Sequence, residues 1–150
     1  MSIVVAIAMS VWRAREARAD VTCGSARWAS LRLRPDRIPI GEVQGAEALD
    51  LLKAWGTGHP GGDGTIHAGS ALGALRRMEQ LIQEVVVTVP RALIAETIQF
   101  IAVLAGRGSD RRLAELACVE GLDSNGNYIL CSVGDRRCSR DTGILAGWTK

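Results

Sequence analysis

The stretch that most constrains the fold of this chain is an amphipathic segment that begins at Ser70. Its apolar side chains recur at alternating steps of four and three residues, at Ala71, Leu75, Met78, Ile82 and Val85. This spacing lines one face of an α-helix, and Ser70 stands where an N-cap hydroxyl would accept from the first turn. A helix with one apolar face has to bury that face against another layer. The segments around it therefore decide the fold class.

Short apolar runs, turn signals and weaker helical patterns flank this helix. The predicted elements follow the order strand, helix, strand, helix, helix and then three strands, at residues 37–40, 45–55, 64–68, 70–85, 90–96, 98–105, 113–119 and 127–131. The glycine-rich segments 106–110 and 123–126 are typical of hairpin turns. The first half predicts an α/β fold with parallel strands and crossover helices, and the second half a small antiparallel meander.

The N-terminal apolar run has two other interpretations that its pattern disfavours. Ile3 to Trp12 is much shorter than the roughly 20 residues of a membrane span. Ala17–Ala19 resembles a signal-cleavage site, but no basic residue precedes the apolar run. We interpret residues 4–19 as a helix and expect a cytoplasmic protein.

Charge and cysteine usage argue against two classes of partner. The formal net charge is only +2, so the chain as a whole does not provide a basic surface for nucleic acid, and direct nucleic-acid binding is not expected. The alternative is that the arginine-rich segments 13–18, 32–37 and 107–112 form a local nucleic-acid-binding surface. A C-x-x-C pair is common in zinc sites, and the four cysteines form none. We therefore expect no zinc site.

Two segments carry residues suited to chemistry. Glu42 follows an apolar strand and Gly41, where a carboxylate can hold Mg²⁺ through water or polarise a water nucleophile. The alternative is an exposed acid that favours the start of the next helix. His59 lies in the glycine-rich loop 56–63 and His67 at the end of the following strand, where an imidazole can donate to a phosphate oxygen. The alternative for each histidine is a structural role, with its ring nitrogens hydrogen-bonded within the fold.

Together these motifs resemble the superfamily of secretion ATPases that drive type IV secretion, conjugation and pilus retraction. The resemblance runs through segments 31–37, 41–43, 47–48, 57–61 and 65–68. The amino-acid sequences of segments 50–60 and 90–96 are similar to those of conjugal-transfer ATPases of the TrbB type. The whole resemblance covers about residues 31–130, which would form the C-terminal half of a RecA-like P-loop ATPase domain. Residues 1–30 would be a divergent helix and linker, and residues 131–150 an irregular tail.

The resemblance implies roles for individual residues. Glu42 falls in the Walker B position, as a catalytic residue and as a Mg²⁺ ligand through water. His67 is the second catalytic candidate. His59 and His67 fall in the family's histidine box. The remaining candidates near the phosphates are Gly58, Gly61, Arg34 and Arg37. ATP and Mg²⁺ are the implied cofactors.

The implied partners are further copies in a hexameric ring, or subunits of an intact ATPase, and a secretion machine at the inner membrane. Arg76 and Arg77, on the long helix, are either structural or reach a neighbouring subunit.

Three departures from the family pattern bear on activity. The sequence contains no G-x-x-x-x-G-K-[ST] loop, and its only lysines are Lys53 and Lys150. That loop supplies the amide cradle and the lysine for the phosphates. Gln44 stands where the family commonly has arginine, and Asp63 adds negative charge beside the histidine loop. We expect the isolated chain to be inactive. The alternative function is a non-enzymatic module that docks into, or regulates, an intact ATPase ring.

Overall fold

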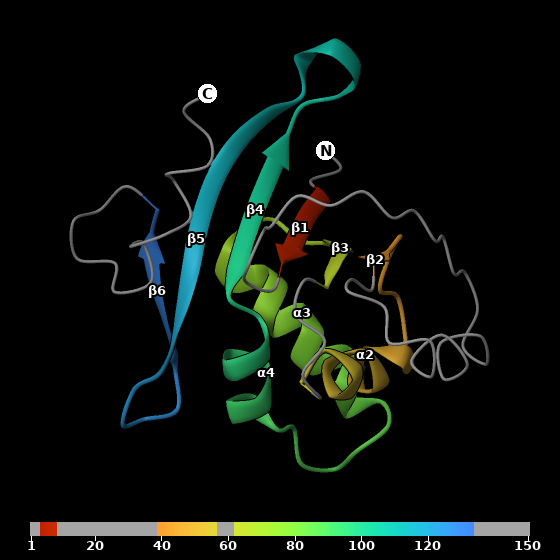
Figure 1. Cartoon of the computed structure of the whole chain (residues 1–150), viewed down its shortest axis with the longest axis vertical. Helices are drawn as coiled ribbons and strands as arrows, with labels where there is room; N and C mark the ends of the chain where they lie inside the picture. Colours follow the sequence, from red (N-terminus) through yellow and green to blue (C-terminus); the bar gives the residue numbers. More distant parts are fainter. Residues whose placement is uncertain (1–3, 9–38, 57–61, 134–150) are drawn as a thin grey trace.

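The computed structural model describes residues 4–8, 39–56 and 62–133, which form one six-stranded sheet with helices packed on it (Figure 1). The strand order is β2-β3-β1-β4-β5-β6. The strands are β1 (Val4–Ala8), β2 (Pro39–Ile40), β3 (Asp63–His67), β4 (Phe100–Ala105), β5 (Arg112–Leu122) and β6 (Tyr128–Ser132). The helices are α2 (Glu47–Gly56), α3 (Ala71–Gln83) and α4 (Arg91–Thr97), with a short 3₁₀ turn at Gly108–Asp110.

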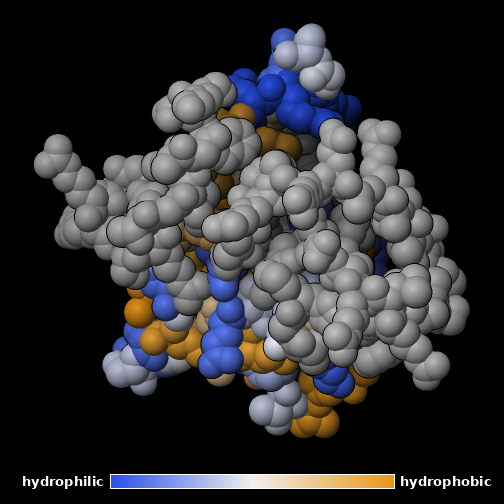
Figure 2. Space-filling view, viewed as in Figure 1, coloured by the Kyte–Doolittle hydropathy of each residue, from blue (hydrophilic) through white to orange (hydrophobic). Residues whose placement is uncertain are grey.

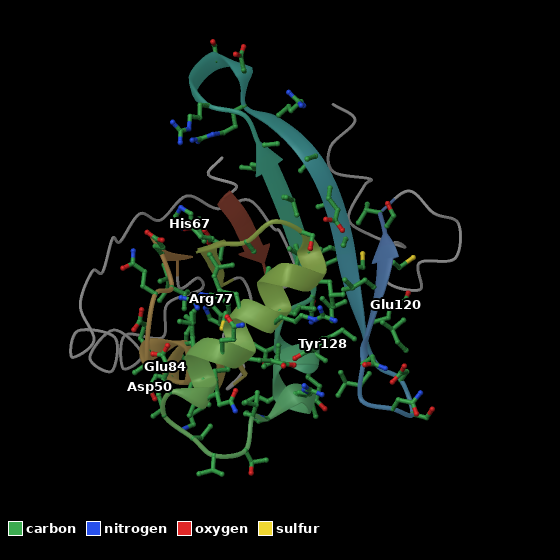
Figure 3. All side chains as sticks on the ribbon, turned by 180° about the vertical axis from the view of Figure 1, so that it is seen from behind. Asp50, His67, Arg77, Glu84, Glu120 and Tyr128 are labelled. Carbon is green, nitrogen blue, oxygen red and sulfur yellow. The ribbon has the colours of Figure 1, made fainter. Side chains whose placement is uncertain are left out.

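The long helix α3 confirms the helix predicted from the apolar spacing, but it ends at Gln83, so Val85 lies beyond it and is 51% exposed rather than buried. Ser70 is its N-cap, and the Ser70 hydroxyl accepts from the amide of Gly73 at 3.0 Å. α3 crosses one face of the sheet, behind β4 in Figure 1 and in front of it in Figure 3. Its fully buried side chains, among them Leu75, Met78 and Ile82, meet Ile101 and Val119 from the sheet in one core.

The N-terminal segment forms a strand, so the expectation of a helix over residues 4–19 is wrong for residues 4–8; the rest of that range lies outside the described residues. β1 runs antiparallel to both β3 and β4 and separates them. Three of its five residues, Val4, Val5 and Ile7, are β-branched, a composition that favours extended chain. A short apolar run cannot be assigned to helix or strand by its period alone, and pairing with two neighbours decides it here.

The parallel part of the sheet is smaller than predicted. Among the strands that the structure describes, only β2 and β3 are adjacent and parallel, with Pro39 opposite Asp63 and Ile40 opposite Gly64. β2 is an edge strand of the described sheet, where a proline is tolerated because its missing amide need not pair. β3 and β4 point the same way and are joined through α3 and α4, but β1 lies between them. The described residues therefore form a mixed α/β domain.

The predicted antiparallel meander is confirmed in β4, β5 and β6. β5 is longer than expected and extends with the end of β4 into a hairpin that protrudes from the body (Figure 1). Gly106 opens the hairpin turn with φ +91°, and a Cβ there would lie 2.2 Å from the Asp110 carbonyl oxygen. Only glycine fits this turn without strain.

Within the described residues, no helix is long and apolar enough to cross a membrane.

Candidate functional site

Glu42 and His67 meet where β2 and β3 end. β2 ends at Ile40, and the chain continues beside β3, with the Val43 amide donating to the Thr65 carbonyl at 2.9 Å. The Thr65 hydroxyl donates to the Gly41 carbonyl. Alternation along β3 buries Ile66 in the core and leaves Thr65 and His67 on the other face. The carboxyl ends of two parallel strands thus bring together residues that are 25 positions apart in sequence.

The two side chains form a close pair. His67 Nδ1 lies 2.6 Å from Glu42 Oε1, with 57% of the histidine side chain and 35% of the glutamate side chain exposed (Figure 3 labels His67). With Nδ1 protonated, the imidazole donates to the carboxylate and leaves Nε2 directed elsewhere as an acceptor. The pair can therefore fix a ring orientation while one ring nitrogen and one carboxylate oxygen remain available to a ligand or water.

Glu47 holds the turn that carries Glu42. Its Oε1 accepts from the amide of Gln44 at 2.9 Å and from the amide of Gly45 at 3.1 Å. This is the reach of a capping-box glutamate back to the residue three positions earlier. The sequence signal was a glutamate in the first turn of α2, three residues after Gln44. We interpreted residues 47–48 only as part of the family pattern and missed this role.

Trp55 of α2 packs closely against Gly62 at the start of β3. Trp55 is 1% exposed, and a Cβ added to Gly62 would lie 2.0 Å from its indole nitrogen. Gly62 immediately precedes β3, so the missing side chain lets the strand enter close to the indole. This tight packing lies at the start of β3, at the opposite end of the strand from His67.

Several predicted site residues lie outside the described residues, namely His59, Gly58, Gly61, Arg34 and Arg37. Asp63 is exposed at the start of β3. On α3, Arg76 is exposed, and Arg77 donates to the Gln80 side chain at 3.3 Å. Among the described residues, no hydrogen bond or ion pair joins either arginine to Glu42 or His67.

The cofactors implied by the resemblance find only part of a site in the described residues. No group of three or more histidine, cysteine, aspartate or glutamate side chains suited to a metal occurs there. Glu42 can contribute one carboxylate to Mg²⁺ through water, and His67 one imidazole to a phosphate. The amide cradle and lysine that hold a triphosphate are missing from the sequence. The described residues at this corner thus offer one carboxylate and one imidazole.

A second charged cluster lies between α3 and α4. Arg91 at the start of α4 binds Glu79 of α3 through two nitrogens, at 2.9 Å from Nε and 3.2 Å from Nη2. Tyr128 of β6 is half-buried beside them, and its buried hydroxyl has no hydrogen-bond partner among the described residues. Burial, and then the nearby Glu79 carboxylate, raise the pKa of Tyr128 well above its ordinary value. The ion pair joins α3 to α4 beside Tyr128, and sequence reasoning missed this cluster because its members are distant in sequence.

Comparison with known proteins places these features among secretion proteins. A family model described as "Type II/IV secretion system protein" matches residues 3–138. The chain is 47% identical over 97 residues to the conjugal transfer protein TrbB of Rhizobium radiobacter, covering 65% of this chain and 30% of that protein. It is 37% identical over 103 residues to the type IV secretion system protein PtlH of Bordetella pertussis, covering 63% of this chain and 30% of the relative. The chain thus spans about a third of the length of these relatives.

Proposed function

Because the chain belongs to the type II/IV secretion system protein family, we propose that it is the C-terminal portion of a traffic ATPase that powers conjugative DNA transfer or type IV secretion. The observation that carries this proposal is the contact of 2.6 Å between Glu42 and His67 at adjacent parallel strand ends. In this proposal residues 31–130 are half of a RecA-like core. Glu42 has the Walker B role, and His59 and His67 belong to the histidine box.

The geometry of the pair supports a task in phosphoryl chemistry. Phosphoryl transfer depends on positioning and on electrostatic stabilisation more than on covalent chemistry by the protein. A glutamate held by an imidazole has a fixed orientation, so one oxygen can accept a proton from a water or hold a metal-bound water. The Glu47 contacts to Gln44 and Gly45 restrict the turn beneath Glu42. In this role His67 fixes the orientation of Glu42 through Nδ1. Its other ring nitrogen, Nε2, can donate or accept a hydrogen bond.

The chain alone is expected to be inactive. ATP and Mg²⁺ remain the implied cofactors, but the residues that would cradle the phosphates must come from another polypeptide or from sequence beyond this chain. The proposed partners are further copies or intact ATPase subunits in a hexameric ring, at the cytoplasmic face of the inner membrane. Gln44, in place of the family's arginine, removes one bidentate partner for a phosphate or carboxylate.

Calorimetry with Mg-ATP tests this proposal directly. The purified chain is titrated alone, and then after mixing with an intact ATPase of the same type, as wild type and as Glu42→Gln. We expect no measurable binding by the chain alone, incorporation into the intact assembly, and a hydrolysis rate that differs between the two mixtures. Micromolar binding of Mg-ATP by the chain alone would show that the chain holds the nucleotide without a phosphate loop. Incorporation with no effect of Glu42→Gln would favour the alternative of a non-enzymatic docking module.

A further inference from the structure

Two cysteines lie directly opposite each other on neighbouring strands of the sheet. β5 and β6 are adjacent at the end of the strand order, and they lie side by side in Figure 1. The register places Cys118 of β5 opposite Cys131 of β6, and both side chains are thiols. Residues directly opposite in an antiparallel pair project from the same face of the sheet, so the two thiols are cross-strand neighbours.

The alternation of side chains along each strand agrees with this placement. Ala117 and Val119, on either side of Cys118, are buried in the core on the face that α3 covers. Cys118 therefore projects from the other face. On β6, Leu130 packs against the same core, which places Cys131 on that other face as well.

The hydrogen bonds between β5 and β6 set the separation of the two cysteines. The Val133 amide donates to the Leu116 carbonyl at 2.9 Å, so these two residues form a hydrogen-bonded pair. Such pairs recur at every second residue, which makes Cys118 and Cys131 the next one. Opposite Cα atoms in a hydrogen-bonded pair are about 5.5 Å apart, and disulfides join Cα atoms about 4.4–6.8 Å apart. The backbone therefore already has the spacing of a disulfide.

The two thiols differ in their exposure. β5 begins in the projecting hairpin, whose tip is hydrophilic surface at the top of Figure 2, and then enters the packed body, where Cys118 is fully buried. Cys131 is half-buried on β6, an outer strand of the described sheet. Its thiol donates to the Ser132 carbonyl at 3.7 Å, a weak contact that leaves the side chain able to turn. A small oxidant therefore reaches Cys131 first.

We propose that Cys118 and Cys131 close a reversible cross-strand disulfide when the protein meets a low-molecular-weight disulfide such as oxidised glutathione. The Cys131 thiolate attacks one sulfur of that disulfide, forms a mixed disulfide and releases one glutathione thiolate. The Cys118 thiolate then attacks Cys131 Sγ and releases the second glutathione thiolate. The two cysteines lose two protons and two electrons, and the small disulfide is reduced to two thiols.

Closure has to draw the two strands slightly together. Opposite Cβ atoms in antiparallel sheets are about 4.5–5.5 Å apart, whereas the Cβ atoms of a disulfide are about 3.8 Å apart. A disulfide that distorts its surroundings is more easily reduced than a relaxed one, so the bond should open again in reduced glutathione. The Glu42–His67 pair lies at the other end of the strand order, so this inference is independent of the proposed function.

Thiol mapping of the full wild-type chain tests the proposal. The folded protein is incubated with oxidised glutathione, quenched with acid, alkylated under denaturing conditions and digested with trypsin. Cleavage after Arg112 and Arg136 leaves both strand cysteines in one peptide, residues 113–136, without Cys23 or Cys138. We expect this peptide to carry no alkyl group and to be lighter than its reduced form by two hydrogen atoms. Excess reduced glutathione should restore alkylation at both positions.

Moving one thiol by a single residue separates strand register from closeness in sequence. The matched variant carries Cys131→Ser with Ser132→Cys, which keeps the thiol on β6 but transfers it to the opposite face. It should stop at the mixed disulfide, with closure to Cys118 slower by on the order of tenfold or more, because the two thiols are no longer held together. Cys118→Ser should stop at a mixed disulfide on Cys131.

Circular dichroism spectra in reductant check that each variant folds like the wild type. The proposal is overturned if the folded wild type retains glutathione on Cys131 while Cys118 is alkylated, or if the peptide closes only after urea unfolds the chain. Closure of the matched variant at the wild-type rate would also overturn it, because closeness in sequence would then suffice. A bond from either strand cysteine to Cys23 or Cys138 in place of the cross-strand bond has the same meaning.

Discussion

Two carboxylates in this molecule hold a cationic or potentially cationic side chain, and they do so in opposite settings. Glu42 meets His67 at the ends of two strands, where both side chains are substantially exposed. Glu79 meets Arg91 through two nitrogens, with only 14% of the glutamate side chain exposed, beside the half-buried Tyr128. The first pair leaves atoms available to a ligand, whereas the second uses its atoms to join α3 and α4.

The two pairs should differ in how much the loss of one partner changes the free energy of unfolding. An exposed ion pair contributes little to folding because water competes for both partners. A shielded pair contributes little net energy as a pair but costs much when one partner is lost. Removing one partner of the Glu42–His67 pair should therefore cost little, whereas removing Glu79 should cost more because its carboxylate is largely shielded from water.

Gly62→Ala should produce the largest effect, because it disturbs the packing of Trp55 against the start of β3, away from both pairs. The new Cβ would lie 2.0 Å from the Trp55 indole nitrogen, and the buried indole cannot swing aside. We expect a loss of about 3 kcal/mol in the free energy of unfolding, the upper part of the overpacking range. Urea denaturation measures it, with Gly69→Ala as the control, since nothing lies within 4 Å of a Cβ at Gly69. Equal values for the two variants would mean that the close contact between Gly62 and Trp55 does not constrain the start of β3.

Glu79→Ala should be the next largest and should lower the free energy of unfolding by about 2 kcal/mol. Losing one partner of a fully buried pair costs about 3–5 kcal/mol, and the half-exposed Arg91 reduces this. The same denaturation experiment compares it with Glu96→Ala, which removes an exposed carboxylate from α4. A loss no greater than that of Glu96→Ala would place Glu79 with the surface pairs and remove the contrast with Glu42.

Tyr128→Phe should change the free energy of unfolding at neutral pH by less than about 0.5 kcal/mol, because the deleted hydroxyl has no partner to lose. At alkaline pH the two proteins should separate. The pKa of Tyr128 is raised in the folded state, so its stabilising effect is complete below the unfolded value of about 10 and declines as pH rises above it. The wild type should therefore lose stability above pH 10 relative to the phenylalanine variant.

The alkaline effect has a direct check in the wild-type protein. The chain contains a single tyrosine, so tyrosinate absorbance reports Tyr128 alone. Folded protein should resist ionisation at a pH where the urea-unfolded chain ionises. Coincident titration curves for the folded and unfolded chain would remove burial as the distinction between this cluster and the Glu42 corner.

Local pattern predicted the elements well and their assembly less well. The apolar steps and the Ser70 cap gave α3 nearly to the residue, and the glycine turns gave the β4–β5–β6 meander. β1 was missed because five apolar residues have no diagnostic period until β3 and β4 pair with them. Glu42 and His67 were chosen from strand-end chemistry, and the parallel strands bring them together. The supports at Thr65 and Glu47, and the Glu79–Arg91–Tyr128 cluster, depend on contacts that no local spacing reveals.

Glu42→Gln and His67→Gln should have the smallest effects on stability, and this smallness is the informative result. Both side chains are exposed enough for water to replace the partner that is lost, so each free energy of unfolding should stay within about 0.5 kcal/mol of the wild type. Asp50→Asn, at an exposed acid in α2, calibrates the denaturation series. A loss above about 1 kcal/mol in either variant would make Glu42–His67 a structural pair like Glu79–Arg91. Unchanged stability would instead mean that any loss of nucleotide-dependent activity in an assembly containing these variants reflects chemistry at the pair, because the fold beneath it is intact.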